Sequence, residues 1–228
     1  MQKQSIRTNM VLAMGLLGIL GAVLTLLSDI VLLGKPGSGS DFFKIGTETM
    51  AGIAQWRITF GTFAGIVVLP FQIAGLVTVY YGLRPAGKAF SLVVVLPIVH
   101  ALTMGVAFHS SYAFIASGWK LSYEMGKGNE LASEMINKFD YYWKIIGFII
   151  LAELLFSSIC YVFMILKRQT LYPKWMSILS PFGVLLILYP IVFAIPAPVG
   201  GFVAPTYVNL STIVFLCFST IVVYKRLK

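Results

Sequence analysis

The feature of this sequence that most restricts its fold is a series of long apolar runs that contain few charged residues. A helix needs about 20 apolar residues to cross the roughly 30 Å hydrocarbon core of a bilayer. Six runs reach that length, at residues 9–34, 56–82, 87–116, 142–166, 175–195 and 205–224. Each must be helical, because a lone strand would leave backbone groups without hydrogen bonds in lipid. The pattern therefore predicts an all-α fold, with residues 1–228 forming a single six-helix transmembrane domain.

Composition agrees with a membrane-embedded chain. Hydrophobic residues make up 58% of the 228 residues and charged residues only 11%, whereas a soluble domain has about 25% charged residues. The first run continues to about residue 34, which is longer than the apolar stretch of a signal peptide. We therefore expect a retained first helix.

The distribution of basic residues predicts the orientation. With the N-terminus inside, the short inner segments contain Lys and Arg but no Asp or Glu, while the outer segments contain both signs. Because short, positively charged loops stay in the cytoplasm, we expect both termini to be cytoplasmic. The expected location is a cell membrane, the bacterial cytoplasmic membrane, with membrane lipids as partners.

The net charge of +9 is explained by this orientation. No cluster of Lys and Arg lies on a soluble surface large enough for a duplex, so nucleic acid is not an expected partner. Cys160 and Cys217 both fall inside apolar runs and are interpreted as small core residues. The sequence contains none of the common nucleotide-binding, hydrolase or zinc-protease motifs. No cofactor and no metal are predicted.

Ionisable residues at membrane depth are the candidates for function, because each costs about 2.5 to 3.5 kcal/mol on insertion scales. The candidates are Asp29, Arg57, His100, His109 and Glu153. Since alternate spans run in opposite directions, Asp29, Arg57 and His109 share the outer third with Asn209, and Glu153 lies somewhat deeper. Their agreement in depth predicts an outer polar pocket, although the sequence does not say which faces point inward.

Several interpretations of these residues stay open. Asp29 and Arg57 could form an ion pair that joins the first two spans. His100 and His109 lie nine residues apart, hence on opposite helix faces, and His100 fits a buried histidine bonded to a backbone or hydroxyl group. A zinc site would require His109 with Asp29 and Glu153. Glu153 must be protonated or paired, as a proton-coupled site, a general acid or base, or a structural strut.

The outer segments contain a second predicted feature. Asn129 can cap a short amphipathic helix over residues 130–139, in which Glu134 and Lys138 form an i,i+4 pair. This helix is either a lid over the pocket or a solubilising connector. Gly61 and Gly65 are spaced for close helix contact, and prolines at 70, 97 and 190 are expected to kink their spans.

The layout resembles a family of uncharacterised bacterial six-span membrane proteins, known only as a domain of unknown function. The matching features are Asp29, Gln55-Trp56-Arg57, the stretch 75–84, Ala107-Phe108-His109 and Asn209. A fainter likeness is to six-span hydrolases of fatty acid esters of hydroxy fatty acids. In those proteins a Thr that follows a Trp-Lys pair works with a His, and Trp56-Arg57-Ile58-Thr59 is similar with the Thr one position early. That likeness implies a dyad of Thr59 and His109.

Two hypotheses follow. In the first, Asp29, Arg57, His109, Glu153 and Asn209 line an outer-half pocket that binds or transports a small molecule or lipid headgroup. In the second, the protein is an intramembrane hydrolase of a lipid ester or amide, with His109 as base and Thr59 or a water as nucleophile. Labelling by a fluorophosphonate probe that is lost in Thr59→Ala and His109→Ala would favour the hydrolase.

Overall fold

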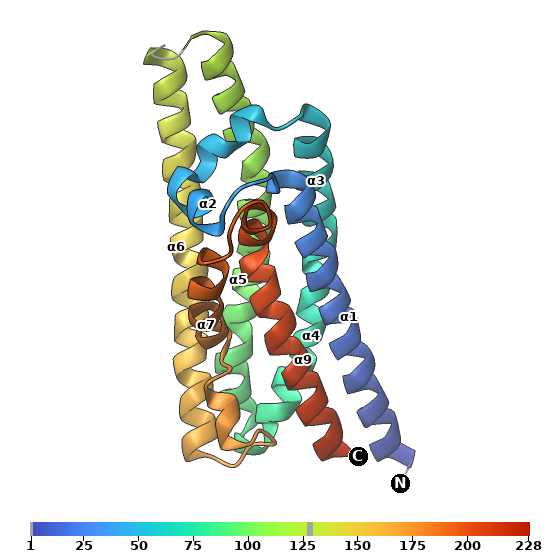
Figure 1. Cartoon of the computed structure of the whole chain (residues 1–228). Coiled ribbons are helices and arrows are strands. Elements are labelled where there is room, and N and C mark those ends of the chain that lie inside the picture. The colour runs from blue at the N-terminus through green and yellow to red at the C-terminus, as the bar shows by residue number, and fades with distance from the viewer. Residues whose placement is uncertain (1, 127–129) are drawn as a thin grey trace.

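The computed structural model describes residues 2–126 and 130–228, and the side chains of all of these except residues 2–5 and 7. This part of the chain forms helices and no strands, which confirms the predicted all-α class (Figure 1). The α-helices are α1 (Gln2–Leu33), α2 (Gly39–Ile45), α3 (Gln55–Val68), α4 (Gln72–Leu83), α5 (Lys88–Glu124), α6 (Glu130–Lys167), α7 (Pro181–Phe193), α8 (Gly200–Val203) and α9 (Tyr207–Leu227). Short 3-10 segments join them: η1 (Gly46–Gly52), η2 (Leu69–Phe71), η3 (Arg84–Ala86), η4 (Lys174–Ser177) and η5 (Ala204–Thr206).

Within the described residues, five stretches are long and apolar enough to cross a membrane. They are Thr8–Leu33, Gln55–Ala86, Lys88–Glu124, Glu130–Lys167 and Gly200–Leu227. The remaining predicted run, 175–195, forms η4 and then α7, which has only 13 residues. At 1.5 Å per residue α7 is about 20 Å long. The helix starts late because Ser180 caps it, accepting a hydrogen bond from the Gly183 amide, with Pro181 in the first turn.

The segment around α7 nevertheless runs from one end of the bundle to the other. At its start, the Leu171 amide donates to the Gly82 carbonyl, beside the end of α4 (2.8 Å). At its end, the Ile195 carbonyl accepts from the Gly39 amide, beyond the end of α1 (2.9 Å). The N- and C-termini lie together at one end of the bundle, and α2 lies towards the other (Figure 1).

The segments at the end of the bundle away from the termini are more helical than the sequence suggests. The predicted amphipathic helix at 130–139 and the fourth span form one continuous helix, α6. The predicted pair within it is present, with Lys138 Nζ 2.6 Å from a Glu134 carboxylate oxygen. The cap predicted at Asn129 lies outside the described residues. Since α5 also continues to Glu124, the α5–α6 hairpin projects beyond the other helices (Figure 1).

The three prolines predicted to kink their spans behave differently. Pro70 interrupts its span, which divides into α3, η2 and α4. Helices α5 and α7 continue through Pro97 and Pro190. The interruption at Pro70 restarts the helix at Gln72, a residue that becomes important below.

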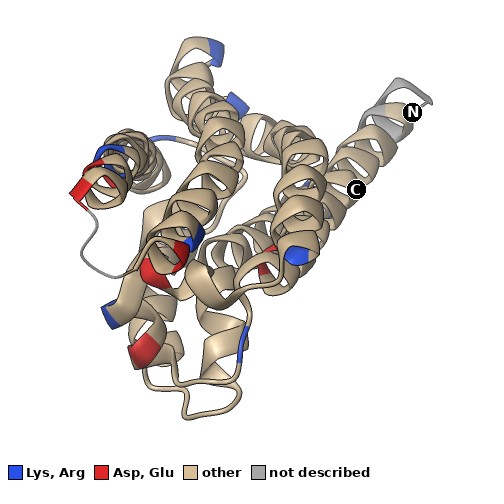
Figure 2. Cartoon of the chain, turned by 90° about the horizontal axis from the view of Figure 1, so that it is seen from above, with Lys and Arg blue, Asp and Glu red and all other residues tan. Residues whose placement is uncertain are grey.

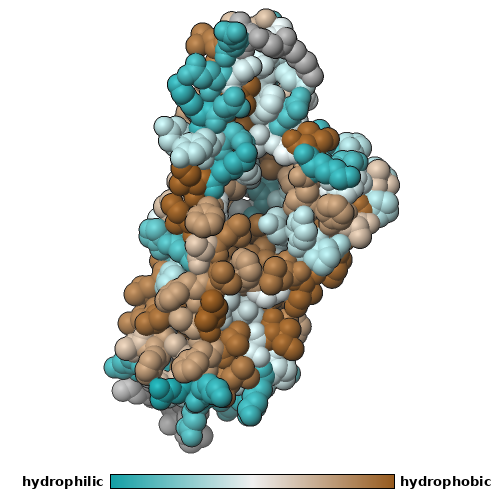
Figure 3. Space-filling model, turned by 90° about the vertical axis from the view of Figure 1, so that its left-hand side faces the viewer, coloured by the Kyte–Doolittle hydropathy of each residue, from teal (hydrophilic) through white to brown (hydrophobic). Residues whose placement is uncertain are grey.

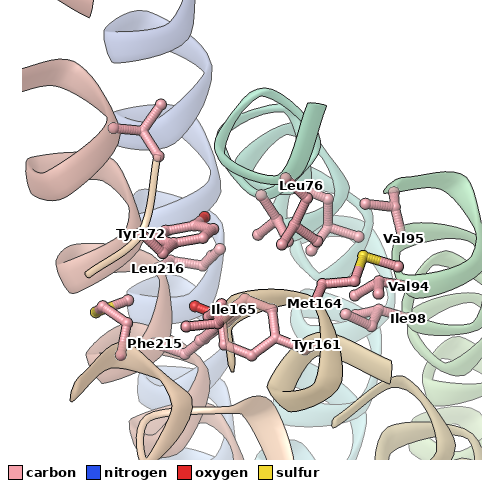
Figure 4. Packing of buried hydrophobic residues seen from close by; sticks show 14 of the residues in the cluster. Leu76, Val94, Val95, Ile98, Tyr161, Met164, Ile165, Tyr172, Phe215 and Leu216 are labelled. Atoms are coloured by element: carbon pink, nitrogen blue, oxygen red, sulfur yellow. The ribbon is translucent and has the colours of Figure 1, made fainter. Parts of the chain in front are cut away.

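Glycines bring the helices around α1 into close contact, which the spacing of Gly61 and Gly65 predicted for α3. A Cβ added at Gly18 would collide with the backbone of Gly75 on α4, and one at Gly61 would lie 2.8 Å from the Leu32 Cα on α1. Nearer the termini, the space between α4, α5, α6 and α9 is filled by a cluster that includes Leu76, Val94, Tyr161, Phe215 and Leu216 (Figure 4).

The molecular surface matches a membrane-embedded protein. An apolar band lies between two hydrophilic ends in Figure 3. Seen from above, the ribbons carry few charged residues (Figure 2). Large apolar side chains such as Leu16, Leu20, Phe148 and Phe163 are exposed, and in a membrane acyl chains rather than water would surround them.

Candidate functional site

A cavity of about 940 Å³ extends from α2 and η1 into the bundle as far as Leu76, Phe215 and Leu216 of the apolar cluster. Residues of α1, α4, α5, α6, α7 and α9 line it, and α2 and η1 contribute to its outer part. Figure 3 shows the surface hollowed below the projecting α5–α6 end. The cavity volume is near the upper end of the 300–1,000 Å³ typical of small-molecule sites. Most of the wall is apolar, with Leu69, Ile98, Leu102 and Leu185 among the lining residues.

Asp29 of α1 is the centre of a buried polar network in the cavity wall. Only 5% of the residue is exposed. One carboxylate oxygen, Oδ1, lies 3.1 Å from His109 Nε2 on α5, and the other, Oδ2, accepts from Asn209 Nδ2 on α9 at 2.6 Å. Three helices that are distant in sequence therefore meet at one carboxyl group; the shared depth of these residues did not say which faces would point inward.

Gln72 extends the network to α4. Its amide nitrogen donates to Asn209 Oδ1 at 2.9 Å and to Thr25 Oγ1 at 3.0 Å. Thr25 in turn donates to the Gly21 carbonyl within α1. The network thus links α1, α4, α5 and α9. These hydrogen bonds fix the side-chain positions, while two buried atoms of the network, Gln72 Oε1 and His109 Nδ1, have no partner among the described residues.

His109 is held tightly on several sides. The imidazole lies directly against Gly65 of α3, where an added Cβ would collide with the ring. The Tyr112 ring meets it edge-on, with centroids 5.5 Å apart. His109 Nδ1 is buried and has no hydrogen-bond partner among the described residues. The ring is therefore positioned by packing and by Asp29, with its second nitrogen covered.

A second set of polar contacts lies where α2 and η1 cover the cavity. Thr47 of η1 donates to Asp140 of α6 at 3.3 Å and accepts from the Trp119 indole at 3.2 Å. Asp140 also pairs with Lys144 at 2.5 Å. At the N-cap of α2, Ser38 donates to Asp41 at 2.6 Å, and this hydrogen bond lowers the pKa of the Asp41 carboxyl. The Thr47 contacts tie η1, over the cavity, to α5 and α6.

Arg57 does not join the network, and the predicted ion pair with Asp29 is not formed. Its guanidinium instead donates to backbone carbonyls at the end of α1, those of Val31 (2.7 Å), Ile30 (3.2 Å) and Gly34. The last carbonyls of a helix lack partners within the helix and carry partial negative charge. Arg57 therefore caps α1, and it lines a separate hollow of about 430 Å³ rather than the main cavity.

Glu153 and His100 form a pair of their own. Glu153 Oε1 lies 2.5 Å from His100 Nδ1, between α6 and α5, and neither residue lines the cavity. His100 is not the buried histidine that the sequence suggested, because 59% of its side chain is exposed. His100 and His109 do lie on different faces of α5, as their spacing predicted. Glu153 therefore does not complete a zinc site with His109 and Asp29.

Thr59 does not form a dyad with His109. It is exposed near the start of α3, and its hydroxyl donates to the Gln55 carbonyl. A different hydroxyl, Ser28 Oγ, lies 3.5 Å from His109 Nε2. That nitrogen also faces Asp29, whereas a catalytic triad uses the two imidazole nitrogens for the two partners. The arrangement is that of a buried polar network rather than of an activated nucleophile.

Sequence reasoning missed Gln72 and Thr25. It considered ionisable groups first, although an uncharged amide inside an apolar run also needs partners in lipid. The position of Gln72 two residues after Pro70 was a usable signal, since a helix interruption at membrane depth often lines a cavity.

Comparison with known proteins identifies a family but no function. A protein-family model described as a family of unknown function (DUF6796) matches residues 1–226. No curated protein and no solved structure matches the chain.

Proposed function

The chain belongs to this family of unknown function (DUF6796), and from the geometry of the cavity we propose that it binds an amphiphilic molecule. The polar head of the ligand would lie at the Asp29 network and its apolar chain along the helices. One observation carries the proposal: a single large cavity joins a buried hydrogen-bonded network to mostly apolar walls. A few fixed polar groups in an apolar pocket are the usual composition of a small-molecule site.

The charges around the cavity favour an uncharged head. Arg57, the residue first expected to bind an anion, is engaged at the end of α1. The described lysines that line the cavity are Lys44 and Lys144, on α2 and on the outer part of α6, and Lys144 is paired with Asp140. A phosphate or carboxylate near Asp29 would face a buried carboxyl group without a lysine or arginine beside it. A head with hydroxyl or ester groups avoids this repulsion.

The proposed orientation places the site in the outer half of the membrane. With both termini in the cytoplasm and α7 counted as the sixth crossing, the cavity faces the outer leaflet. An amphiphile could then enter from that leaflet with its chain among the apolar side chains and its head at the network. The positively charged inner segments support this orientation.

Native mass spectrometry of the purified protein tests the proposal with ligands that share one oleoyl chain. Monoolein, oleate and oleoyl lysophosphatidic acid differ mainly in the charge of the head. We expect monoolein to be retained most strongly and the lysophosphatidic acid least. The variant Asn209→Leu should reduce retention, because it removes the amide that bridges Asp29 and Gln72.

Thr59→Val is the matched control, since Thr59 is exposed and lies outside the cavity lining. The proposal would be overturned if none of the three ligands were retained, or if Asn209→Leu retained monoolein as well as Thr59→Val does. The same incubation tests the hydrolase hypothesis. Release of oleate from monoolein that disappears in Thr59→Ala and His109→Ala would replace binding by catalysis as the function.

A further inference from the structure

One exposed face of α5 differs from the other lipid-facing surfaces of the protein. The residues along it are His100, Thr103, Ala107, Ser110, Phe114 and Ser117. Five of these are exposed and Ser110 is partly exposed. They follow one another at alternating intervals of three and four residues, the spacing of a helix-packing seam. The cavity lies on another face of α5, the one that contains Ala101, Gly105 and Tyr112.

The neighbouring helices show what a lipid-facing surface of this protein looks like elsewhere. On α1 the exposed residues include Leu16, Leu20 and Leu27, and on α6 they include Phe148, Phe156 and Phe163. These are large apolar side chains suited to acyl chains. Small residues and hydroxyl groups are instead enriched where helices pack together in membranes, because they let backbones approach closely. Most of the seam on α5 consists of such small or hydroxyl-bearing residues, namely Thr103, Ala107, Ser110 and Ser117.

An intramembrane polar pair lies on this seam. His100 is 59% exposed, and Glu153 beside it on α6 is 23% exposed by side chain. The second carboxylate oxygen of Glu153 is buried and has no hydrogen-bond partner among the described residues. Ionisable groups inside a bilayer nearly always face a bundle interior or a water-filled cavity, because exposure to lipid is costly. In one isolated copy, Glu153 is mostly covered but the His100 ring is exposed on the apolar surface.

We propose that this α5 seam packs against the same seam of a second copy of the chain, across a two-fold axis parallel to the membrane normal. A second copy brings its own histidine, carboxylate and hydroxyl groups to the same depth, which acyl chains cannot do. The seam is also self-complementary: the exposed His100 ring of one copy offers a nitrogen, and the exposed Thr103 hydroxyl of the other, one turn along the helix, offers an oxygen. The proposal concerns a face outside the cavity and does not depend on the ligand.

Disulfide crosslinking in membranes tests the interface. In a background with Cys160→Ala and Cys217→Ala, the variants Thr103→Cys and Ser110→Cys should each crosslink two copies when oxidised with copper phenanthroline. In a parallel two-fold dimer, each seam residue lies near its own counterpart. The matched controls are Leu20→Cys and Phe156→Cys, which are 52% and 51% exposed on α1 and α6. Crosslinking at the controls equal to that at the seam would overturn the proposal, as would no crosslinking at the seam.

A second measurement tests the role of the polar pair. The double variant His100→Leu/Glu153→Leu removes both groups together, so that neither side chain is left in lipid without its partner. Self-association, followed by energy transfer between labelled copies in liposomes, should weaken by about threefold for each interhelical hydrogen bond lost. If association is unchanged while the seam crosslinks persist, then the pair is not part of the interface as proposed.

Discussion

At the scale of single residues, the site depends on Asp29, whose two oxygens serve different helices. In Asp29→Leu both carboxylate oxygens are removed, so Asn209 Nδ2 and the buried His109 Nε2 each lose the partner that Asp29 supplies. We expect a loss of about 1–3 kcal/mol of stability, the usual cost of an unsatisfied buried group. Thermal unfolding in detergent measures it. Glu134→Gln, an exposed site, is the control, and equal melting of the two variants would contradict the role given to Asp29.

Gly65 permits a second residue-scale prediction. The His109 ring lies where a Cβ at position 65 would be, and Asp29 holds that ring in place. Gly65→Ala should therefore destabilise the protein by about 1–3 kcal/mol, as overpacking does, and should weaken monoolein retention. Gly52→Ala is the matched control, because nothing lies within 4 Å of its added Cβ. Similar melting temperatures for both variants would show that the contact is not tight.

The same residues show what a sequence can predict about such a site. Hydropathy gives the depth of each residue in the membrane, and depth correctly grouped Asp29, His109 and Asn209. Depth does not give the direction around the helix axis. Glu153 and Thr59 therefore became candidates because of their depth, although their side chains lie on other helix faces. The role of Arg57 depended on where α1 ends, which a run of apolar residues does not fix.

At the scale of helices, Arg57 connects the end of α1 with the start of α3. Removing it in Arg57→Leu leaves the carbonyls of Ile30, Val31 and Gly34 without these donors. We expect faster amide hydrogen exchange across the last turn of α1, next to Asp29, and weaker monoolein retention. Arg57→Lys should restore little, because an ammonium lacks the planar fork of donors. Arg226→Leu, exposed near the end of α9, is the control, and unchanged exchange in Arg57→Leu would refute the capping role.

Helix boundaries were predictable where the apolar pattern itself stops, and less so elsewhere. Pro70 interrupts its span, but Pro97 and Pro190 lie inside continuous helices, so the missing amide hydrogen of proline did not by itself predict the break. The continuity of α6 was not predicted either, because the charged residues 130–140 look like a separate amphipathic segment although they have good helix propensity. The length of α7 depended on local capping by Ser180, which lies inside an otherwise uninterrupted apolar run.

At the scale of the whole molecule, the number of crossings is constrained by the positions of the termini. Both termini lie at one end of the bundle (Figure 1), so the chain must cross an even number of times. The described residues contain five long apolar helices, which leaves the segment with α7 as the remaining crossing. Its hydrogen bonds to Gly82 at one end and to Gly39 at the other agree with this assignment. Six crossings with both termini inside is therefore the topology that we propose.

Labelling of single cysteines with a membrane-impermeant maleimide tests this topology, in a background without Cys160 and Cys217. Gly37→Cys and Glu124→Cys should react in intact cells, whereas Lys174→Cys and Lys228→Cys should react only after permeabilisation. Val199→Cys, in the segment that follows α7, is the most informative further site and should react in intact cells, because Gly37 is hydrogen-bonded to Pro198 and Gly201 on either side of it. If Val199→Cys reacts from the same side as Lys174→Cys, the short helix does not cross, and five crossings would put the termini on opposite sides. If all five sites react from the sides opposite to those expected, the orientation is reversed and the cavity opens to the inner leaflet.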